Sequence, residues 1–217
     1  MAMLTMDAVP ILKSACGVPF GELLEGHPAD LTTNKGHAGQ LIEQYIGLSL
    51  GNALTDFEDG ELKTNKTRPD GQPLETIAVT QISKIIDQLL DDPPRPFCES
   101  PVSKKLNNLL VVPIVKPEQC SDWYLLDVYH IDLTSNKALR EQFEEDYLSI
   151  CRELRDKVEA GGRVSTTNGR YLQVRSKDSK PYRPIYSSVF ERNVSTKNHA
   201  FYLQTSFVKD ILSGKIG

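Results

Sequence analysis

The sequence has no long hydrophobic run, few aromatic residues and no closely spaced cysteines. Its longest apolar run, from Leu109 to Val115, is far shorter than the roughly 18 residues that a membrane-spanning helix needs. The N-terminal segment lacks the pattern of a secretory signal, because Asp7 comes early and no basic residue precedes the apolar stretch. We therefore expect a soluble, cytoplasmic protein with no membrane partner.

The four cysteines and four histidines are scattered along the chain. No two cysteines have the short spacing of a zinc site or of a dithiol redox motif, so we expect reduced thiols and no histidine–cysteine metal centre. The chain has 217 residues, of which 39% are apolar and 25% charged. This is enough to bury a sizeable core, and it excludes a disordered or disulfide-stapled protein.

Charge is distributed unevenly. The segment from Arg163 to the C-terminus holds ten basic and three acidic residues, a net charge of +7, whereas the preceding residues carry −11. A basic last quarter on an acidic body is typical of a protein in which one face meets a polyanion. The alternative is that this basic segment packs on the acidic part of the same chain. Charge alone does not separate the two.

Hydrophobic spacing predicts a mixed α/β protein, with helices packed on a central mixed sheet. Helices are expected over residues 7–16, 20–24, 35–48, 83–90, 100–106, 139–158 and 206–212. Ser135 is expected to cap the helix over 139–158. Strands are expected over 61–65, 75–82, 109–115, 123–131, 170–175, 185–190 and 201–204. The chain is interpreted as one domain, 1–217, with the proline-rich loop DDPPRP as a candidate division into two lobes, approximately 1–92 and 93–217, around a cleft.

One short segment carries a constellation suited to chemistry, namely Asp56, Glu61 and Lys63. Side chains two apart on a strand share a face, so Glu61 and Lys63 should point the same way. A turn at Asp59–Gly60 would bring Asp56 beside Glu61. Two neighbouring carboxylates resist joint ionisation unless a divalent cation lies between them.

These three residues therefore predict a Mg²⁺ site on Asp56 and Glu61. Beside it, Lys63 would orient a water molecule and stabilise the negative charge that develops on phosphorus. The pattern is short, and acid-x-Lys occurs again at Asp178 and Lys180. The alternative is a solvated hairpin with a surface ion pair worth about 0–1 kcal/mol.

Glu43 lies on the predicted 35–48 helix, away from its apolar stripe. Gly39 and Gly47 stand four residues before and after it, so positions without side chains flank it on the helix. A helical glycine costs about 1 kcal/mol relative to alanine. This cost favours a close approach by another element, such as the strand of the metal site or DNA; the alternative is an exposed glutamate on a poor helix.

Six blocks together resemble one known family. In order, between about residues 35 and 212, they are KGHAGQLIE, DFEDGELKT, GQPLET, SKKLNNLLVVPI, YLQVRSK and FYLQTSF. They are similar to the MutH family, which comprises strand-nicking endonucleases of methyl-directed mismatch repair and related type II restriction enzymes that cut at GATC. The resemblance implies a PD-(D/E)XK restriction-endonuclease-like fold and Mg²⁺-dependent phosphodiester hydrolysis that leaves 5′-phosphate and 3′-hydroxyl ends.

The resemblance also assigns roles to individual residues. Asp56, Glu61 and Lys63 match the catalytic triad, and Glu43 matches the helical active-site glutamate. Lys105, in the block SKKL, matches a lysine near the scissile phosphate.

In the basic segment, Arg175, Ser176 and Lys177 match the loop that the family places in the DNA groove, and Tyr202 matches a tyrosine that reads adenine. Lysine is also a side chain that donates to guanine O6 and N7. Two departures concern the spacing from Asp56 to Glu61, which is shorter than in the mismatch-repair nickase, and Ser176, where that nickase has proline.

Three functional hypotheses follow. The first is a type II restriction endonuclease for double-stranded DNA, acting at GATC or a related palindrome as a homodimer, because one active centre per chain must be doubled to cut both strands. The second is a monomeric nickase of mismatch repair. The third is a catalytically inactive DNA-binding module with the same fold.

Overall fold

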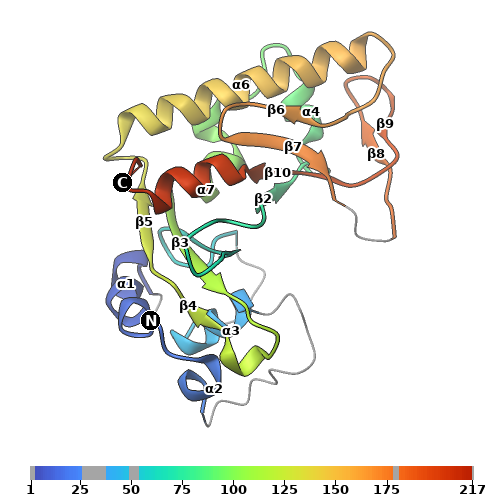
Figure 1. Ribbon diagram of the computed structural model, residues 1–217. Coiled ribbons are helices and arrows are strands. Elements are labelled where there is room, and N and C mark those ends of the chain that lie inside the picture. Colours follow the sequence, from blue (N-terminus) through green and yellow to red (C-terminus); the bar gives the residue numbers. More distant parts are fainter. Residues whose placement is uncertain (1–2, 26–37, 49–53, 178–180, 217) are drawn as a thin grey trace.

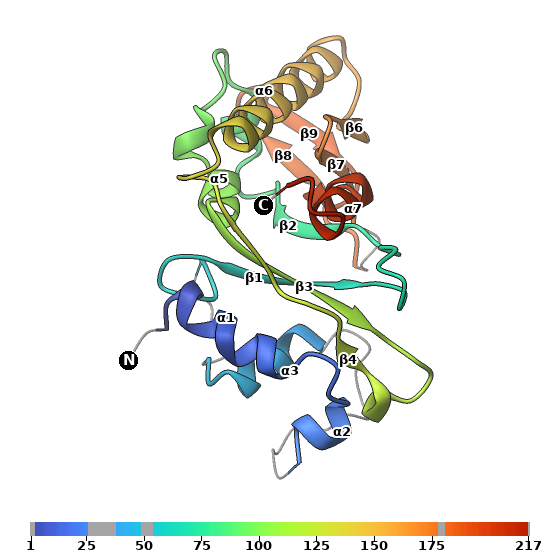
Figure 2. The ribbon, with the colours of Figure 1, turned by 60° about the vertical axis from the view of Figure 1, so that its left-hand side comes forward.

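The computed structural model describes residues 3–25, 38–48, 54–177 and 181–216. Two bodies are seen in Figure 1. They meet along β1 (Glu61–Lys66) and β3 (Asn108–Val115), which run side by side in Figure 2. The lower body carries the N-terminal helices, and the long helix α6 (Lys137–Glu159) crosses the top of the upper body. Turning the molecule shows α1 (Thr5–Ser14) packed below the β1–β3 pair (Figure 2).

The first sheet is mixed. β1 pairs in parallel with β3, and β3 pairs antiparallel with β4 (Tyr124–Leu125) and β5 (Tyr129–Asp132). The second sheet is antiparallel, in the order β2 (Ile77–Gln81), β10 (His199–Leu203), β7 (Leu172–Ser176) and β6 (Thr167–Asn168). A hairpin of β8 (Ile185–Ser187) and β9 (Arg192–Ser195) stands apart.

The remaining elements are short. They are α2 (Phe20–Leu23), α3 (Ala38–Tyr45), α4 (Ile86–Leu90), α5 (Pro101–Leu106), α7 (Thr205–Leu212) and the 3₁₀ turns η1 (Phe97–Glu99) and η2 (Cys120–Asp122). None of the helices in the described ranges has the length and apolar character to cross a membrane.

The apolar strand β3 separates two hydrophobic cores. Its side chains alternate between faces, so Leu109 and Val111 enter the larger core and Leu110 and Val112 enter the smaller one. The smaller core lies among α1, α2 and α3, and the larger lies between the second sheet and α6. A strand that is buried on both faces has a continuous run of apolar residues, which is why β3 could be predicted from the sequence.

The mixed α/β class is confirmed, but the strands lie in three sheets among the described residues rather than in one central sheet. The prediction of one strand over 123–131 is wrong, because the strand is interrupted at residues 126–128, and β4 and β5 pair with β3 as two short pieces. The strand expected over 185–190 ends at Ser187, and the short β6 and β9 were not foreseen.

Two boundary predictions also need correction. The cap of α6 is Asn136, whose side chain accepts a hydrogen bond from the backbone N–H of Leu139 at 3.1 Å, whereas the Ser135 hydroxyl donates to the carbonyl of Asp132. The predicted helix over 35–48 is α3, which ends at Tyr45, so the predicted end at 48 is wrong; residues 35–37 of that prediction lie outside the described residues. The lobes approximately 1–92 and 93–217 stay a prediction, although residues of β2 and α4, before 92, pack in the larger core.

Candidate active site

The loop before β1 is fixed by Asp59 and Gly60. One oxygen of Asp59 accepts hydrogen bonds from the backbone N–H (2.8 Å) and the hydroxyl (2.6 Å) of Thr5, and the other accepts from Asn108 Nδ2 at 2.9 Å. A Cβ on Gly60 would collide with the carbonyl oxygen of Asn108. The turn predicted from the sequence therefore also ties the loop to α1 and β3, through the hydrogen bonds of Asp59 with Thr5 and Asn108, which we call the Asp59 clasp. Sequence reasoning missed this role of Asp59.

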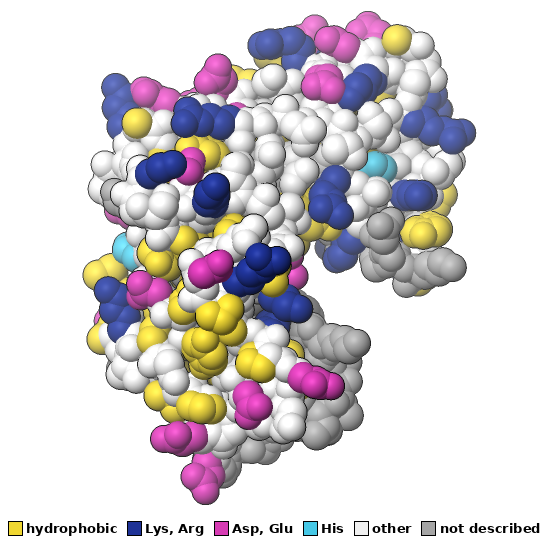
Figure 3. All heavy atoms as spheres, viewed as in Figure 1, with side chains coloured by type: hydrophobic (Ala, Val, Ile, Leu, Met, Phe, Trp, Pro, Cys, Tyr) yellow, Lys and Arg dark blue, Asp and Glu magenta, His cyan; other side chains and the backbone are white. Residues whose placement is uncertain are grey.

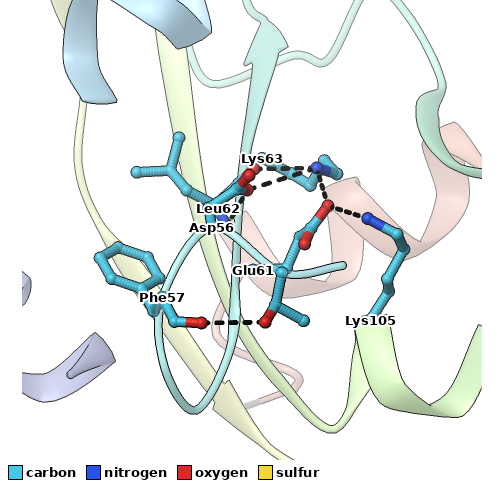
Figure 4. A network of polar contacts seen from close by, with 7 residues as sticks. Asp56, Phe57, Glu61, Leu62, Lys63 and Lys105 are labelled. Carbon is cyan, nitrogen blue, oxygen red and sulfur yellow. Dashed lines mark hydrogen bonds and ion pairs between the residues drawn. The ribbon is translucent and has the colours of Figure 1, made fainter. Parts of the chain in front are cut away.

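The clasp brings Asp56, Glu61 and Lys63 together, as predicted (Figure 4). The Asp56 carboxylate accepts a hydrogen bond from the backbone N–H of Leu62 at 2.9 Å, and the same oxygen lies 3.7 Å from Lys63 Nζ. Lys63 Nζ also donates to Glu61 Oε1. Leu62, between them in sequence, enters the smaller core, so the alternation of faces expected for this strand is confirmed.

Lys105 joins this cluster from α5. Ser100 caps that helix by accepting a hydrogen bond from the backbone N–H of Ser103 at 3.1 Å, and Pro101 occupies its first turn, a common start for a helix. Lys105 in the last turn then places its Nζ 2.6 Å from Glu61 Oε1 (Figure 4). Glu61 is thus contacted by two lysines, one from its own strand and one from a helix 44 residues away in sequence.

Glu61 is 2% exposed, so the alternative of a solvated surface pair is wrong. Its Oε2 atom is buried and has no hydrogen-bond partner among the described residues. A buried carboxylate oxygen without a partner costs free energy on the order of 1–3 kcal/mol or more. Such an atom fits a site that is completed by a ligand.

Glu43 on α3 lies near the same cluster. Its half-buried carboxyl group has a pKa raised above the usual range, first by burial and then by the negative charge of Asp56. Lys63 opposes this shift. Three acidic side chains therefore share the neighbourhood with two lysines, Lys63 and Lys105, and the surplus negative charge suits a cation.

The two glycines beside Glu43 do not have the role that the sequence suggested. A Cβ on Gly39 would make only ordinary contacts, 3.8 Å from Glu43 Oε1 and 3.9 Å from Thr64 Oγ1. Gly47 has a φ of +82° just after the end of α3, a conformation that glycine adopts without strain. No close approach requires either glycine, so that part of the argument for Glu43 is wrong.

The residues present fit a divalent cation at the Asp56–Glu61 pair. The unpartnered Oε2 of Glu61 and the nearby oxygens of Asp56 are the hard ligands that Mg²⁺ prefers. No group of three or more His, Cys, Asp or Glu side chains in the described ranges has the geometry of a metal site. Any cation would therefore take its remaining ligands from water or from a phosphate, as Mg²⁺ commonly does.

The predicted DNA-reading residues lie on neighbouring strands. Arg175 and Ser176 end β7, and Tyr202 is on β10, where it pairs with Gln173. The exposed Arg175 guanidinium lies over the Tyr202 ring, 5.3 Å from its centre. Lys177 follows β7 and is held by a 2.8 Å hydrogen bond from its backbone N–H to the carbonyl of Asn198.

In the described part of the chain, the basic segment forms no ion pair with the acidic part. Among the described residues from Arg163 onward, the one ion pair is Lys215 with Asp210, inside the segment itself. Lys and Arg side chains gather beneath β7 and β10, where the molecule is hollowed (Figure 3). This finding disfavours the self-packing alternative.

A groove of about 520 Å³ connects the two predicted sites. Lys105 of the catalytic cluster and Lys177 of the reading loop both line it, together with Lys84 from the segment after β2. We refer to it as the lysine groove. Sequence reasoning missed Lys84, because a lone lysine between two elements carries no signal in one sequence.

Comparison with known proteins finds relatives but no matching family model. A DNA mismatch repair protein MutH of Haemophilus influenzae is 30% identical over 212 residues, which cover 93% of this chain and 91% of that protein. The MutH proteins of Histophilus somni and Serratia proteamaculans are 29% and 28% identical, over 92% and 93% of this chain and 90% and 89% of the relatives.

Proposed function

Because the chain belongs to the MutH family, we propose that it is a DNA endonuclease that hydrolyses phosphodiester bonds with Mg²⁺ as its cofactor. The supporting observation is Glu61, a buried carboxylate beside Asp56, contacted by two lysines and left with one unpartnered oxygen. We further propose that the β1–β3 sheet with its flanking helices is the PD-(D/E)XK core.

The roles of the residues follow from their positions. Asp56 and Glu61 would hold the cation, which when bound would polarise the phosphoryl group as a Lewis acid. Lys63, within reach of both carboxylates, would orient the attacking water and stabilise the charge that develops on phosphorus. Lys105 would contact the scissile phosphate, and Glu43, with its raised pKa, would accept a proton near the attacking water.

We propose that the surface around β7 and β10 reads the DNA sequence. Arg175, Ser176 and Lys177 would enter the major groove and Tyr202 would contact adenine, at GATC or a related palindrome. The neighbouring positions of Arg175 and Tyr202 and the hydrogen bond that fixes Lys177 support a preformed reading surface. The target sequence and its response to methylation are decided by this surface.

The relatives reported above favour the nicking alternative over a double-strand cut, since each of them is named as a DNA mismatch repair protein. A monomer with one active centre would cut one strand of a duplex. The type II restriction activity and the homodimer expected from the sequence form the second candidate, which the departure at Ser176 in the reading loop favours.

Incubation of the purified protein with supercoiled plasmid and Mg²⁺ separates the candidates. A nickase gives open-circular product, and a dimeric restriction enzyme gives linear product. Mapping the ends on methylated and unmethylated DNA gives the site. The variant Lys63→Ala should abolish either activity, and undiminished cutting by it would overturn the role of Lys63.

The third hypothesis, a catalytically inactive module that binds DNA, predicts a different result. Such a module binds duplex DNA equally well with and without Mg²⁺ or Ca²⁺ and cuts under neither ion. The retained Asp56, Glu61 and Lys63 cluster argues against it, because an inactive copy has no need for a buried carboxylate with an unpartnered oxygen.

A further inference from the structure

We infer that Lys84 binds a backbone phosphate of the DNA in the lysine groove and positions the duplex between the catalytic and reading residues. The inference rests on the proposed function, since it needs DNA in this groove. Lys84 is neither in the catalytic cluster nor in the reading loop. Its role is positioning, because it lines the groove without contacting Asp56 or Glu61.

The charge of the groove points to a polyanion. Three lysines from three separate segments line it, and the described residues that line it include no acidic side chain. An adjacent groove of about 600 Å³ differs, since it combines Lys104 and Arg140 with Glu58, Asp59 and Glu144. Of these two grooves, the lysine groove is the one whose charged lining residues are all of one sign, which is what attracts a phosphate backbone.

The segment that carries Lys84 is held in place from both sides. The backbone N–H of Ile82 donates to the carbonyl of His199 on β10 at 3.1 Å, and that of Ile85 donates to the carbonyl of Ile82 at 3.0 Å. The side chains of Ile82 and Ile85 are 0% and 7% exposed. Ser83 and Lys84, between these two anchors, are exposed to the groove.

The lysines of the groove differ in their partners. Lys105 is paired with Glu61, as is Lys63 in the adjoining cluster. Lys84 forms no ion pair with any described residue, so no described acidic side chain compensates its charge. A lysine that neutralises one phosphate releases condensed counterions, and the slope of log affinity against log salt concentration changes by about 0.9 for each such contact.

Salt-dependent binding tests the inference. The affinity for a GATC-containing duplex is measured by fluorescence anisotropy at several salt concentrations, with Ca²⁺ in place of Mg²⁺. The wild type is compared with Lys84→Gln and with the matched control Lys104→Gln, an exposed lysine that lines the adjacent groove. Lys84→Gln should reduce the slope by about 0.9. Lys104→Gln should keep the wild-type slope, and Lys84→Arg should restore it.

Cleavage kinetics provide a second readout. Loss of a positioning contact that is equal in ground and transition states should raise KM several-fold and leave kcat within about twofold. A Lys84→Gln slope equal to that of the wild type and the control would overturn the inference, even if the wild type cuts DNA. Failure of the wild type to bind or cut any duplex would overturn the proposed function as well.

Discussion

Lys105 Nζ lies 2.6 Å from Oε1 of Glu61, and this contact joins α5 to β1 across 44 residues of sequence. The lysine is 17% exposed and the carboxylate 2%. The same carboxylate oxygen accepts from Lys63. The contact therefore places two cations beside one buried anion, at the point where the lysine groove reaches the catalytic cluster.

We expect Lys105→Met to lower kcat about 10²–10³-fold, because a preorganised positive donor at a developing negative charge contributes on that scale. The chain should stay folded, because Lys63 still pairs with Glu61. Lys104→Met is the matched control, since this exposed neighbour does not contact Glu61. Plasmid cleavage rates measure the effect, and equal rates for the two variants would remove Lys105 from the mechanism.

The raised pKa of Glu43 should make the stability of the protein depend on pH. Its pKa is raised by burial and by Asp56, so folding favours the protonated form. The associated stability is present below the pKa of an unfolded glutamate and is lost as pH rises through the raised pKa. Glu43→Gln removes this group, so the wild type should lose stability relative to the variant as pH rises above the pKa of an unfolded glutamate, about 4.3.

Urea denaturation at several pH values checks this prediction. Asp156→Asn, at an exposed position of α6, controls for the loss of one carboxylate. Parallel pH profiles for the wild type and Glu43→Gln would contradict the assigned environment of Glu43.

Substitutions of two glycines, Gly60 in the active-site loop and Gly39 in α3, should have opposite effects on stability. A Cβ on Gly60 would collide with the Asn108 carbonyl and lie 2.5 Å from Thr5 Oγ1, so Gly60→Ala should displace the loop and lower both stability and cleavage. Gly39→Ala has room in α3 and should stabilise the chain by up to about 1 kcal/mol. Thermal unfolding of both variants measures this, and a stable Gly60→Ala would contradict the close packing.

The strand that carries Arg175 is held by Asp146 of α6. The Asp146 carboxylate accepts hydrogen bonds from the backbone N–H groups of Arg170 (2.8 Å), Tyr171 (2.7 Å) and Leu172 (2.9 Å). Removing it leaves buried donors without partners, so Asp146→Ala should cost on the order of 3 kcal/mol. Asp156→Ala, exposed on the same helix, should change stability by less than about 0.5 kcal/mol. Similar stabilities of the two variants would contradict this role.

Local sequence patterns were sufficient to predict the helices and strands whose apolar residues recur with a regular period. The apolar run of β3, the alternation of Glu61, Leu62 and Lys63, and the apolar spacing of α6 were sufficient because each depends on residues close in sequence. The cluster of Asp56, Glu61 and Lys63 lies within eight positions, so it was predictable for the same reason. Lys105 required the family resemblance, because α5 reaches Glu61 only through the tertiary fold.

What could not be predicted depends on contacts distant in sequence. The Asp59 clasp joins Thr5 and Asn108 to the active-site loop, and the lysine groove brings Lys84 to Lys105 and Lys177. The distribution of strands over three sheets depends on which edges pair. Periodicity indicates which face of a strand is buried but not which strand lies beside it.

The most direct test of the central claim is the cleavage of supercoiled plasmid as a function of Mg²⁺ concentration by the wild type and by Glu61→Gln. The variant keeps the size of the side chain and removes the charge of the buried carboxylate. We predict saturable, Mg²⁺-dependent cutting by the wild type and a loss of at least about 10²-fold in the variant. Equal cutting by both proteins, or cutting without a divalent ion, would contradict the account.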